Sequence, residues 1–382
     1  MKVLILIPGL PVNINDIKGG VNSALINLLT GFSKKMVTVR VLSFNRDMTS
    51  VSLTQFSPNV EIYYIPESGL PHVFNFAFNG SRVVRRHIKE FNPDVVHFAM
   101  SGYILLTGLF GLRKKHALVT IHGIAFKEAR QKERLREKLV WYSNGLVELL
   151  LRPANIIHLS NYSYSLLPAS KKGCVTIIPN AVNPVFFDLP LKTATDSRII
   201  YAGSIDANKN IIFLLKTLSS LKAKNIFYFL NVVGDFTDDH YKKEVLDYIS
   251  NNQLEQNVMF HGWLSQENFQ RELVKCDILM VSSRQESLPM VIAEAMSAGK
   301  VVVSSITGGT PEMITDRMNG FLFDLNQPEM AIDILERLYN NNQLMQTIQL
   351  AAKQTAVSVY HCGSVADRTI EFYRSLHNKH RN

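Results

Sequence analysis

The chain has 382 residues, of which 46% are hydrophobic and 19% are charged. This length exceeds what one ordinary hydrophobic core requires, so two domains are expected. No low-complexity tract or short repeat occurs, which excludes a disordered chain or a solenoid. The three cysteines are odd in number and widely spaced, which argues against a disulfide framework or a zinc knuckle and favours a reducing cytoplasm.

The net charge of +9 is concentrated in the first half of the chain. Residues 1–190 contain 22 Lys and Arg against 11 Asp and Glu, whereas residues 191–382 contain 19 against 21. Nucleic acid is the weakest interpretation, because no zinc-finger, helix-turn-helix or RNP-like motif accompanies the charge. Two interpretations stay open: an ordinary solvated surface, and a face that rests on an anionic membrane through clusters such as 82–86 and 113–115.

Apolar runs rich in β-formers alternate with helical patterns along the whole chain. The first run is interpreted as a buried strand and not as a signal segment, because no small-residue cleavage site follows it. No run reaches the roughly 20 apolar residues that span a bilayer. The predicted strands are 2–7, 37–43, 60–65, 95–98, 117–121, 156–160 and 175–178 in the first half, and 198–202, 227–233, 258–261, 278–282, 301–304 and 320–323 in the second.

This alternation predicts two α/β domains of the doubly wound, Rossmann-like type. The polar, proline-bearing stretch 183–193 separates them, and we place the boundary at residue 188. Ligands of open α/β sheets bind at the carboxyl ends of the strands, so the active site is expected in a cleft between the two domains.

The most informative segment runs from Asp277 to Gly299. It combines a buried strand, a loop with the carboxylate Glu286, Pro289 near a helix start, and Glu294 one to two turns into the helix. Carboxylates at this place suit polyols, because each accepts two hydrogen bonds from neighbouring hydroxyls. An isolated pair would more simply be two surface charges.

Together with residues 301–305 and 308–312, this segment resembles the donor-site signature of the family-four retaining glycosyltransferases, which have the two-domain GT-B fold. In that family the first glutamate of an E-x7-E motif contacts the donor sugar and the second holds the nucleotide ribose. By position these are Glu286 and Glu294. The resemblance also assigns the intervening loop residues to the donor site: Ser287, which replaces a common glycine, Leu288 and Pro289.

Further matches follow the family's order along the chain. Gly19 and Gly20 precede an apolar-periodic helix, and their backbone N–H groups would face an anion. His122 ends a predicted strand, where the family has a histidine that faces the donor sugar. The segment 178–183 resembles a motif that sets the geometry between the domains. Residues 359–382 resemble the terminal helix that crosses back onto the first domain, which leaves 189–358 as the nucleotide-sugar domain.

The residues expected to bind the donor pyrophosphate depart from the family pattern. The family often has an arginine after the glycine that corresponds to Gly203, and a lysine five residues further on, both holding the donor pyrophosphate. Lys209 is present, but Ser204 replaces the arginine. A neutral hydroxyl makes a hydrogen bond roughly half as strong as a charged donor. We therefore expect either a substitute cation, with Arg284 as the candidate, or a lower rate.

The resemblance implies a retaining hexosyltransferase in which His122, Lys209 and Glu286 are catalytic. No D-x-D motif or His/Asp cluster is found, so metal-independent transfer without a cofactor is expected, from a UDP- or GDP-sugar to a saccharide or lipid-linked acceptor. Synthesis of bacterial O-antigen, capsule or exopolysaccharide at the inner face of the plasma membrane fits this activity. Two alternatives stay open: a weakly active or inactive partner subunit that binds nucleotide sugar, and a dinucleotide-dependent oxidoreductase, disfavoured by the missing G-x-G-x-x-G motif.

Overall fold

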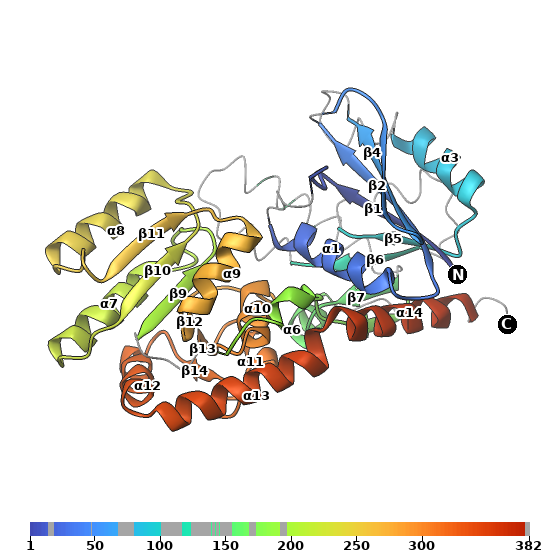
Figure 1. Ribbon diagram of the computed structural model, residues 1–382. Coiled ribbons are helices and arrows are strands. Elements are labelled where there is room, and N and C mark those ends of the chain that lie inside the picture. The colour runs from blue at the N-terminus through green and yellow to red at the C-terminus, as the bar shows by residue number, and fades with distance from the viewer. Residues whose placement is uncertain are drawn as a thin grey trace. The chain divides into compact units, whose positions relative to one another are not determined.

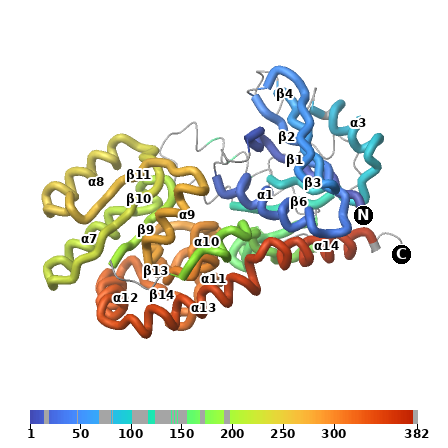
Figure 2. Tube along the Cα trace, in the orientation of Figure 1, coloured from blue at the N-terminus to red at the C-terminus, as the bar shows by residue number. Residues whose placement is uncertain are grey.

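The computed structural model describes residues 1–13, 19–46, 48–67, 80–100, 117–123, 139, 142, 145, 155–167, 173–191 and 197–378. The chain divides into two compact units, Met1–Ala181 with Cys362–Asn382, and Val182–His361 (Figures 1 and 2). The first boundary lies before the predicted residue 188, because Val182 and Phe186 are fully buried in the core of the second unit. The second boundary lies after the predicted residue 358, at the start of the last helix.

The first unit is built on an eight-stranded sheet with the order β3-β4-β2-β1-β5-β6-β7-β8. Its strands are β1 (Lys2–Pro8), β2 (Thr38–Asn45), β3 (Ser52–Ser57), β4 (Val60–Pro66), β5 (Val95–Phe98), β6 (Ala117–Ile121), β7 (Asn155–His158) and β8 (Val175–Ile177). Every strand predicted in this half is present. The edge strand β3, antiparallel to β4, was not predicted, because none of its residues is fully buried and it lacks an apolar run.

Four described helices belong to this unit: α1 (Gly20–Phe32), α3 (Ser81–Phe91), α6 (Asn161–Leu166) and α14 (Cys362–Asn378). The C-terminal helix α14 lies beside α1 in Figure 1, and Ile370 and Tyr373 share the core beneath it with β1 and β2. Gly31 permits this close approach, because a Cβ at that position would lie 2.3 Å from the carbonyl oxygen of Cys362. The last segment of the chain is therefore part of the first unit.

The second unit contains a six-stranded, fully parallel sheet with the order β11-β10-β9-β12-β13-β14. Its strands are β9 (Arg198–Ala202), β10 (Phe229–Val233), β11 (Val258–Gly262), β12 (Ile278–Val281), β13 (Val301–Ser305) and β14 (Phe321–Phe323). This order is that of a Rossmann fold, in which the winding reverses between the two central strands, here β9 and β12. The predicted doubly wound architecture is confirmed in both units.

The helices of this unit follow the sequence patterns that start and stop helices. They are α7 (Ile211–Ala223), α8 (Asp239–Asn251), α9 (Gln266–Lys275), α10 (Met290–Ser297), α11 (Thr310–Met313), α12 (Pro328–Asn340) and α13 (Asn342–Tyr360), and a 3-10 turn, η4 (Pro184–Phe186), precedes them. The side chain of Asp238 caps α8, and that of Ser265 caps α9. Among the described residues no helix is long and apolar enough to cross a membrane.

Candidate functional site

Two loops meet where the winding of the second sheet reverses. One loop, residues 203–210, follows β9, and the other, residues 282–289, follows β12. The backbone N–H of Arg284 donates to the carbonyl oxygen of Asn208 at 2.7 Å, and the Asn208 amide donates to the carbonyl of Gln285 at 3.2 Å. The fold thus joins two motifs that the sequence analysis had located separately.

The centre of this junction is the carboxylate of Glu286. Its Oε1 accepts a hydrogen bond from Lys209 Nζ at 2.5 Å and another from Ser283 Oγ at 2.7 Å. Both Lys209 and Glu286 are half-buried. A carboxylate suited to sugar hydroxyls and a cation suited to phosphate therefore lie within one hydrogen bond of each other.

The loop after β9 is held in a defined shape by Asp206. Its Oδ1 accepts from the backbone N–H of Lys209, and its Oδ2 accepts from the hydroxyl of Ser204, each at 2.9 Å. The Tyr201 hydroxyl donates to the Ser204 carbonyl at 2.6 Å. The side chain of Ser204 is exposed. The position that the family fills with arginine is thus open to solvent at the edge of the loop.

A close backbone approach supports the same loop. Gly203 and Gly234 have φ angles of +153° and +132°, in the range that disfavours other residues. A Cβ on Gly234 would lie 1.9 Å from the Gly203 carbonyl oxygen. The loop after β10 therefore fits against the loop after β9 only because glycine stands at this point.

Hydroxyl groups that the sequence analysis did not single out hold the loop after β12. Ser282 Oγ lies 3.0 Å from the carbonyl oxygens of Lys209 and Asn210, and Ser305 Oγ donates to the Ser283 carbonyl at 2.7 Å. Thr307 Oγ1 donates to the Arg284 carbonyl at 2.9 Å. Each of these residues lies at the end of a strand or within two residues after it, and this position was the available signal for their role.

Arg284 lies on the loop after β12 and contacts the loop that carries Lys209. Its side chain is exposed, and its Nε donates to the carbonyl oxygen of Ala207 at 3.2 Å. A guanidinium is therefore present beside the loop in which Ser204 replaces the family's arginine.

The second glutamate of the motif lies in α10. The helix begins after the buried Pro289, and Glu294 is half-buried within it. Burial raises the pKa of the Glu294 carboxyl to about 7. Among the residues that the structure describes, its side chain makes no hydrogen bond or ion pair. Leu288 packs on the core below this loop, and Ser287 is half-buried.

The remaining predicted residues lie in the first unit. Gly19 and Gly20 are exposed at the start of α1, where Gly19 has a φ of +86° and no side chain caps the helix. His122 follows β6 and hydrogen-bonds the backbone of Ala99, and burial lowers its pKa to about 4. Its imidazole is therefore neutral at physiological pH. No group of three potential metal ligands occurs in the described ranges.

Two family models match consecutive parts of the sequence. The model for Glycosyltransferase Family 4 matches residues 18–186, and that for Glycosyl transferases group 1 matches residues 187–355. The chain is a glycosyltransferase of the group 1 and family 4 type. Glu286, Glu294 and Lys209 lie in the segment matched by the group 1 model, and His122 lies in the segment matched by the family 4 model.

Individual glycosyltransferases support the same assignment. An uncharacterised glycosyltransferase of Methanocaldococcus jannaschii is 23% identical over 76% of this chain and 78% of its own length. The lipopolysaccharide 1,2-N-acetylglucosaminetransferase of Salmonella typhimurium is 28% identical over 50% of this chain and 51% of its own length. Anabaena HepE, solved with UDP and glucose, superposes with a TM-score of 0.74 at 17% identity, covering 98% of this chain and 100% of HepE. The fold of this glycosyltransferase is GT-B.

Proposed function

We propose that this glycosyltransferase moves a hexose from a UDP- or GDP-sugar to a saccharide or lipid-linked acceptor with retention of the anomeric configuration. The observation that carries the proposal is the contact between Lys209 and Glu286 at the carboxyl ends of β9 and β12. A nucleotide sugar has sugar hydroxyls next to phosphate groups. The Glu286 carboxylate can accept hydrogen bonds from the hydroxyls, and the neighbouring Lys209 ammonium can donate to the phosphates.

In this mechanism, donor binding separates the ion pair. Sugar hydroxyls donate to the Glu286 carboxylate, while Lys209 moves its charge to the β-phosphate oxygens. The bond from the anomeric carbon to the phosphate oxygen breaks, and the bond to the acceptor oxygen forms on the same face. The acceptor's proton leaves with the nucleoside diphosphate. Lys209 lowers the barrier because it stabilises negative charge that develops on the leaving group.

Glu294 is the proposed ribose ligand. Its carboxylate has no partner in the described part of the protein, and two ribose hydroxyls would supply hydrogen bonds that offset its desolvation. Ser287, Leu288 and Pro289 shape the loop between the two glutamates. Arg284 supplies the second cation, which the family often has as an arginine at the position of Ser204. His122, as a neutral imidazole, contacts a sugar hydroxyl, and the N–H groups at Gly19 and Gly20 face phosphate.

Polysaccharide synthesis at the inner face of the plasma membrane is the proposed setting. The Salmonella relative acts on lipopolysaccharide, and the HepE structure holds UDP and glucose. One side of helix α3 is buried through Val84 and His87. The other side exposes four basic side chains, Arg82, Arg85, Arg86 and Lys89. Each basic residue near an anionic surface contributes about 1 kcal/mol, which suits reversible attachment. The other basic cluster, 113–115, lies outside the described residues.

The test is thermal shift against UDP, GDP, ADP and CMP, followed by release of nucleoside diphosphate from the matching sugars with and without EDTA. We expect one nucleotide to raise the melting temperature by about 5–10 °C at a hundredfold excess over its Kd. Turnover that survives EDTA supports metal-independent transfer. Binding without turnover would favour the partner-subunit alternative, and no shift with any nucleotide would contradict the proposal. Sedimentation with phosphatidylglycerol vesicles, with phosphatidylcholine vesicles as control, tests the attachment of α3.

A further inference from the structure

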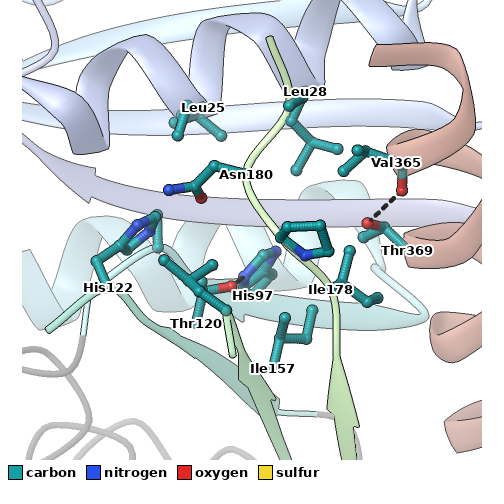
Figure 3. A pocket seen from close by; sticks show the side chains of 15 residues that line it. Leu25, Leu28, His97, Thr120, His122, Ile157, Ile178, Asn180, Val365 and Thr369 are labelled. Carbon is teal, nitrogen blue, oxygen red and sulfur yellow. Dashed lines mark hydrogen bonds between the residues drawn. The ribbon is translucent and has the colours of Figure 1, made fainter. Parts of the chain in front are cut away.

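A cavity of about 40 Å³ lies in the first unit next to His122 (Figure 3). Its lining comes from the carboxyl-terminal parts of neighbouring strands, from the residues that follow four of them, and from two helices. Ala99 follows β5, His122 follows β6, Leu159 follows β7, Ile178 follows β8, and Leu25 and Val365 lie on α1 and α14. The cavity is thus at the edge of the sheet where open α/β sheets bind ligands.

The walls of the cavity are predominantly aliphatic. Leu25, Leu28, Ile157 and Val365 project around it in Figure 3. A water molecule needs about 10–15 Å³ of such volume, so roughly three waters or one small substituent would fit. Apolar cavities stay dry. A small apolar group is therefore the better occupant.

Most of the polar side chains in the lining are already used within the protein. His97 lies 2.7 Å from Tyr373 Oη through Nδ1 and 2.7 Å from Thr120 Oγ1 through Nε2. Thr369 Oγ1 donates to the Val365 carbonyl at 2.8 Å. Because of these contacts, the inner part of the cavity offers a ligand few hydrogen-bond donors or acceptors.

Asn180 differs from these residues. It is half-buried, and its amide makes no hydrogen bond within the described ranges of the chain. In the view of Figure 3 its side chain extends toward the side on which His122 lies. His122 is also half-buried, whereas His97 and Thr120 are buried. The more accessible end of the cavity therefore has an amide and an imidazole, and its interior is aliphatic.

We infer that this cavity is a subsite for the acetamido group of an N-acetylated sugar, with the methyl group in the aliphatic interior and the amide at Asn180. An amide has one donor and one acceptor that match those of the asparagine side chain. A hydroxyl has no apolar part to bury, and the methyl group of a 6-deoxy sugar would leave Asn180 unpaired. The inference rests on the proposed transferase function and specifies its substrate class.

The test compares matched sugars that differ only in the acetamido group. One arm uses UDP-N-acetylglucosamine against UDP-glucose as donors, and the other uses N-acetylglucosaminide against glucoside acceptors. Ala24, which lines the cavity from α1, supplies the first variant. Ala24→Leu fills the cavity, and Lys216→Ala, exposed on α7 and outside the cavity, serves as the control. Asn180→Ala removes the amide.

In one of the two arms we expect the unmodified enzyme to prefer the acetamido sugar by on the order of tenfold in kcat/KM. Ala24→Leu and Asn180→Ala should each abolish most of that preference and leave the hydroxyl sugar within about twofold, and Lys216→Ala should change neither. Turnover without any such preference, a preference for a 6-deoxy sugar, or an equal loss for both sugars in Ala24→Leu would overturn the inference.

A binding measurement keeps the subsite separate from the transferase reaction. In saturation-transfer NMR with UDP-N-acetylglucosamine and with methyl N-acetylglucosaminide, the acetyl methyl protons of one ligand should receive the strongest signal, which Ala24→Leu should reduce. Retention of that signal in Ala24→Leu would refute the subsite even if transfer is absent. Failure of all nucleotides to bind would instead count against the proposed function.

Discussion

Lys209 Nζ donates to Glu286 Oε1 at 2.5 Å, across the point where the winding of the second sheet reverses. The two residues are 77 positions apart in the chain, and the same carboxylate oxygen also accepts from Ser283. The cation and the carboxylate are therefore held in place by each other and by the loop before any ligand enters.

Lys209→Ala should lower kcat for sugar transfer by about 100- to 1,000-fold, because one charged donor to the leaving phosphate is lost. Steady-state release of nucleoside diphosphate measures the effect. Lys216→Ala, on the exposed side of α7, is the matched control and should leave kcat unchanged. A Lys209→Ala enzyme within about twofold of the unmodified rate would refute the phosphate role.

Arg284 is expected to compensate for the neutral Ser204. Arg284→Ala should reduce kcat/KM for the donor by roughly tenfold, because a charge-assisted hydrogen bond to the pyrophosphate is removed. Ser204→Arg in that background should restore much of the loss, since position 204 is exposed on the loop that the Arg284 guanidinium contacts at Ala207. Arg271→Ala, whose guanidinium pairs with Glu267 on α9, is the control. Unchanged donor turnover in Arg284→Ala would show that Arg284 does not act as the substitute cation.

Glu294 should make stability and nucleotide affinity depend on pH in opposite directions. Burial raises its pKa from 4.5 to about 7, so the folded protein holds the proton more tightly than the unfolded chain. This contribution to stability is complete below pH 4.5 and is lost as the pH rises through about 7. Glu294→Gln cannot ionise, so it should raise the melting temperature of the nucleotide-free protein by about 5 °C near pH 8 and change it little near pH 5.

Nucleotide binding provides the complementary measurement for Glu294. The ionised carboxylate accepts hydrogen bonds from the ribose more strongly than the neutral acid, so affinity should increase between about pH 6 and pH 8. Isothermal titration with the preferred nucleoside diphosphate measures this rise, and Glu294→Gln should bind weakly with a flat profile. An identical pH profile in both proteins would exclude Glu294 as the ribose ligand.

Gly234→Ala should destabilise the second unit by several kcal/mol. The added Cβ would lie 1.9 Å from the Gly203 carbonyl oxygen, and the φ of +132° at this position is itself unfavourable for alanine. Urea unfolding measures the loss. Thr237→Ala, further along the same connection, is the control, because the described structure gives its side chain no hydrogen bond. A Gly234→Ala protein of normal stability would mean that the two loops can separate without cost.

The fold class followed from sequence because parallel strands buried on both faces leave continuous apolar runs. Ile278–Val281 and Val301–Ser305 are examples, with every residue buried. β3 has no such run and forms only because β4 offers it an edge to pair with. The two compact units divide a few residues before the predicted boundary at residue 188 for a related reason. Val182 and Phe186 lie in a segment with loop composition, and only packing assigns them to the second unit.

For the site, the amino-acid sequence by itself determined which residue types are available: two glutamates with seven residues between them, a lysine after a glycine loop, and a serine where an arginine is common. Tertiary structure decided which of them meet. The contact of Lys209 with Glu286, the hydroxyl of Ser282 beneath the lysine loop and the aliphatic cavity beside His122 all depend on segments distant in sequence. Spacing along a chain encodes local conformation, whereas these distances are set by how parallel strands order themselves in a sheet.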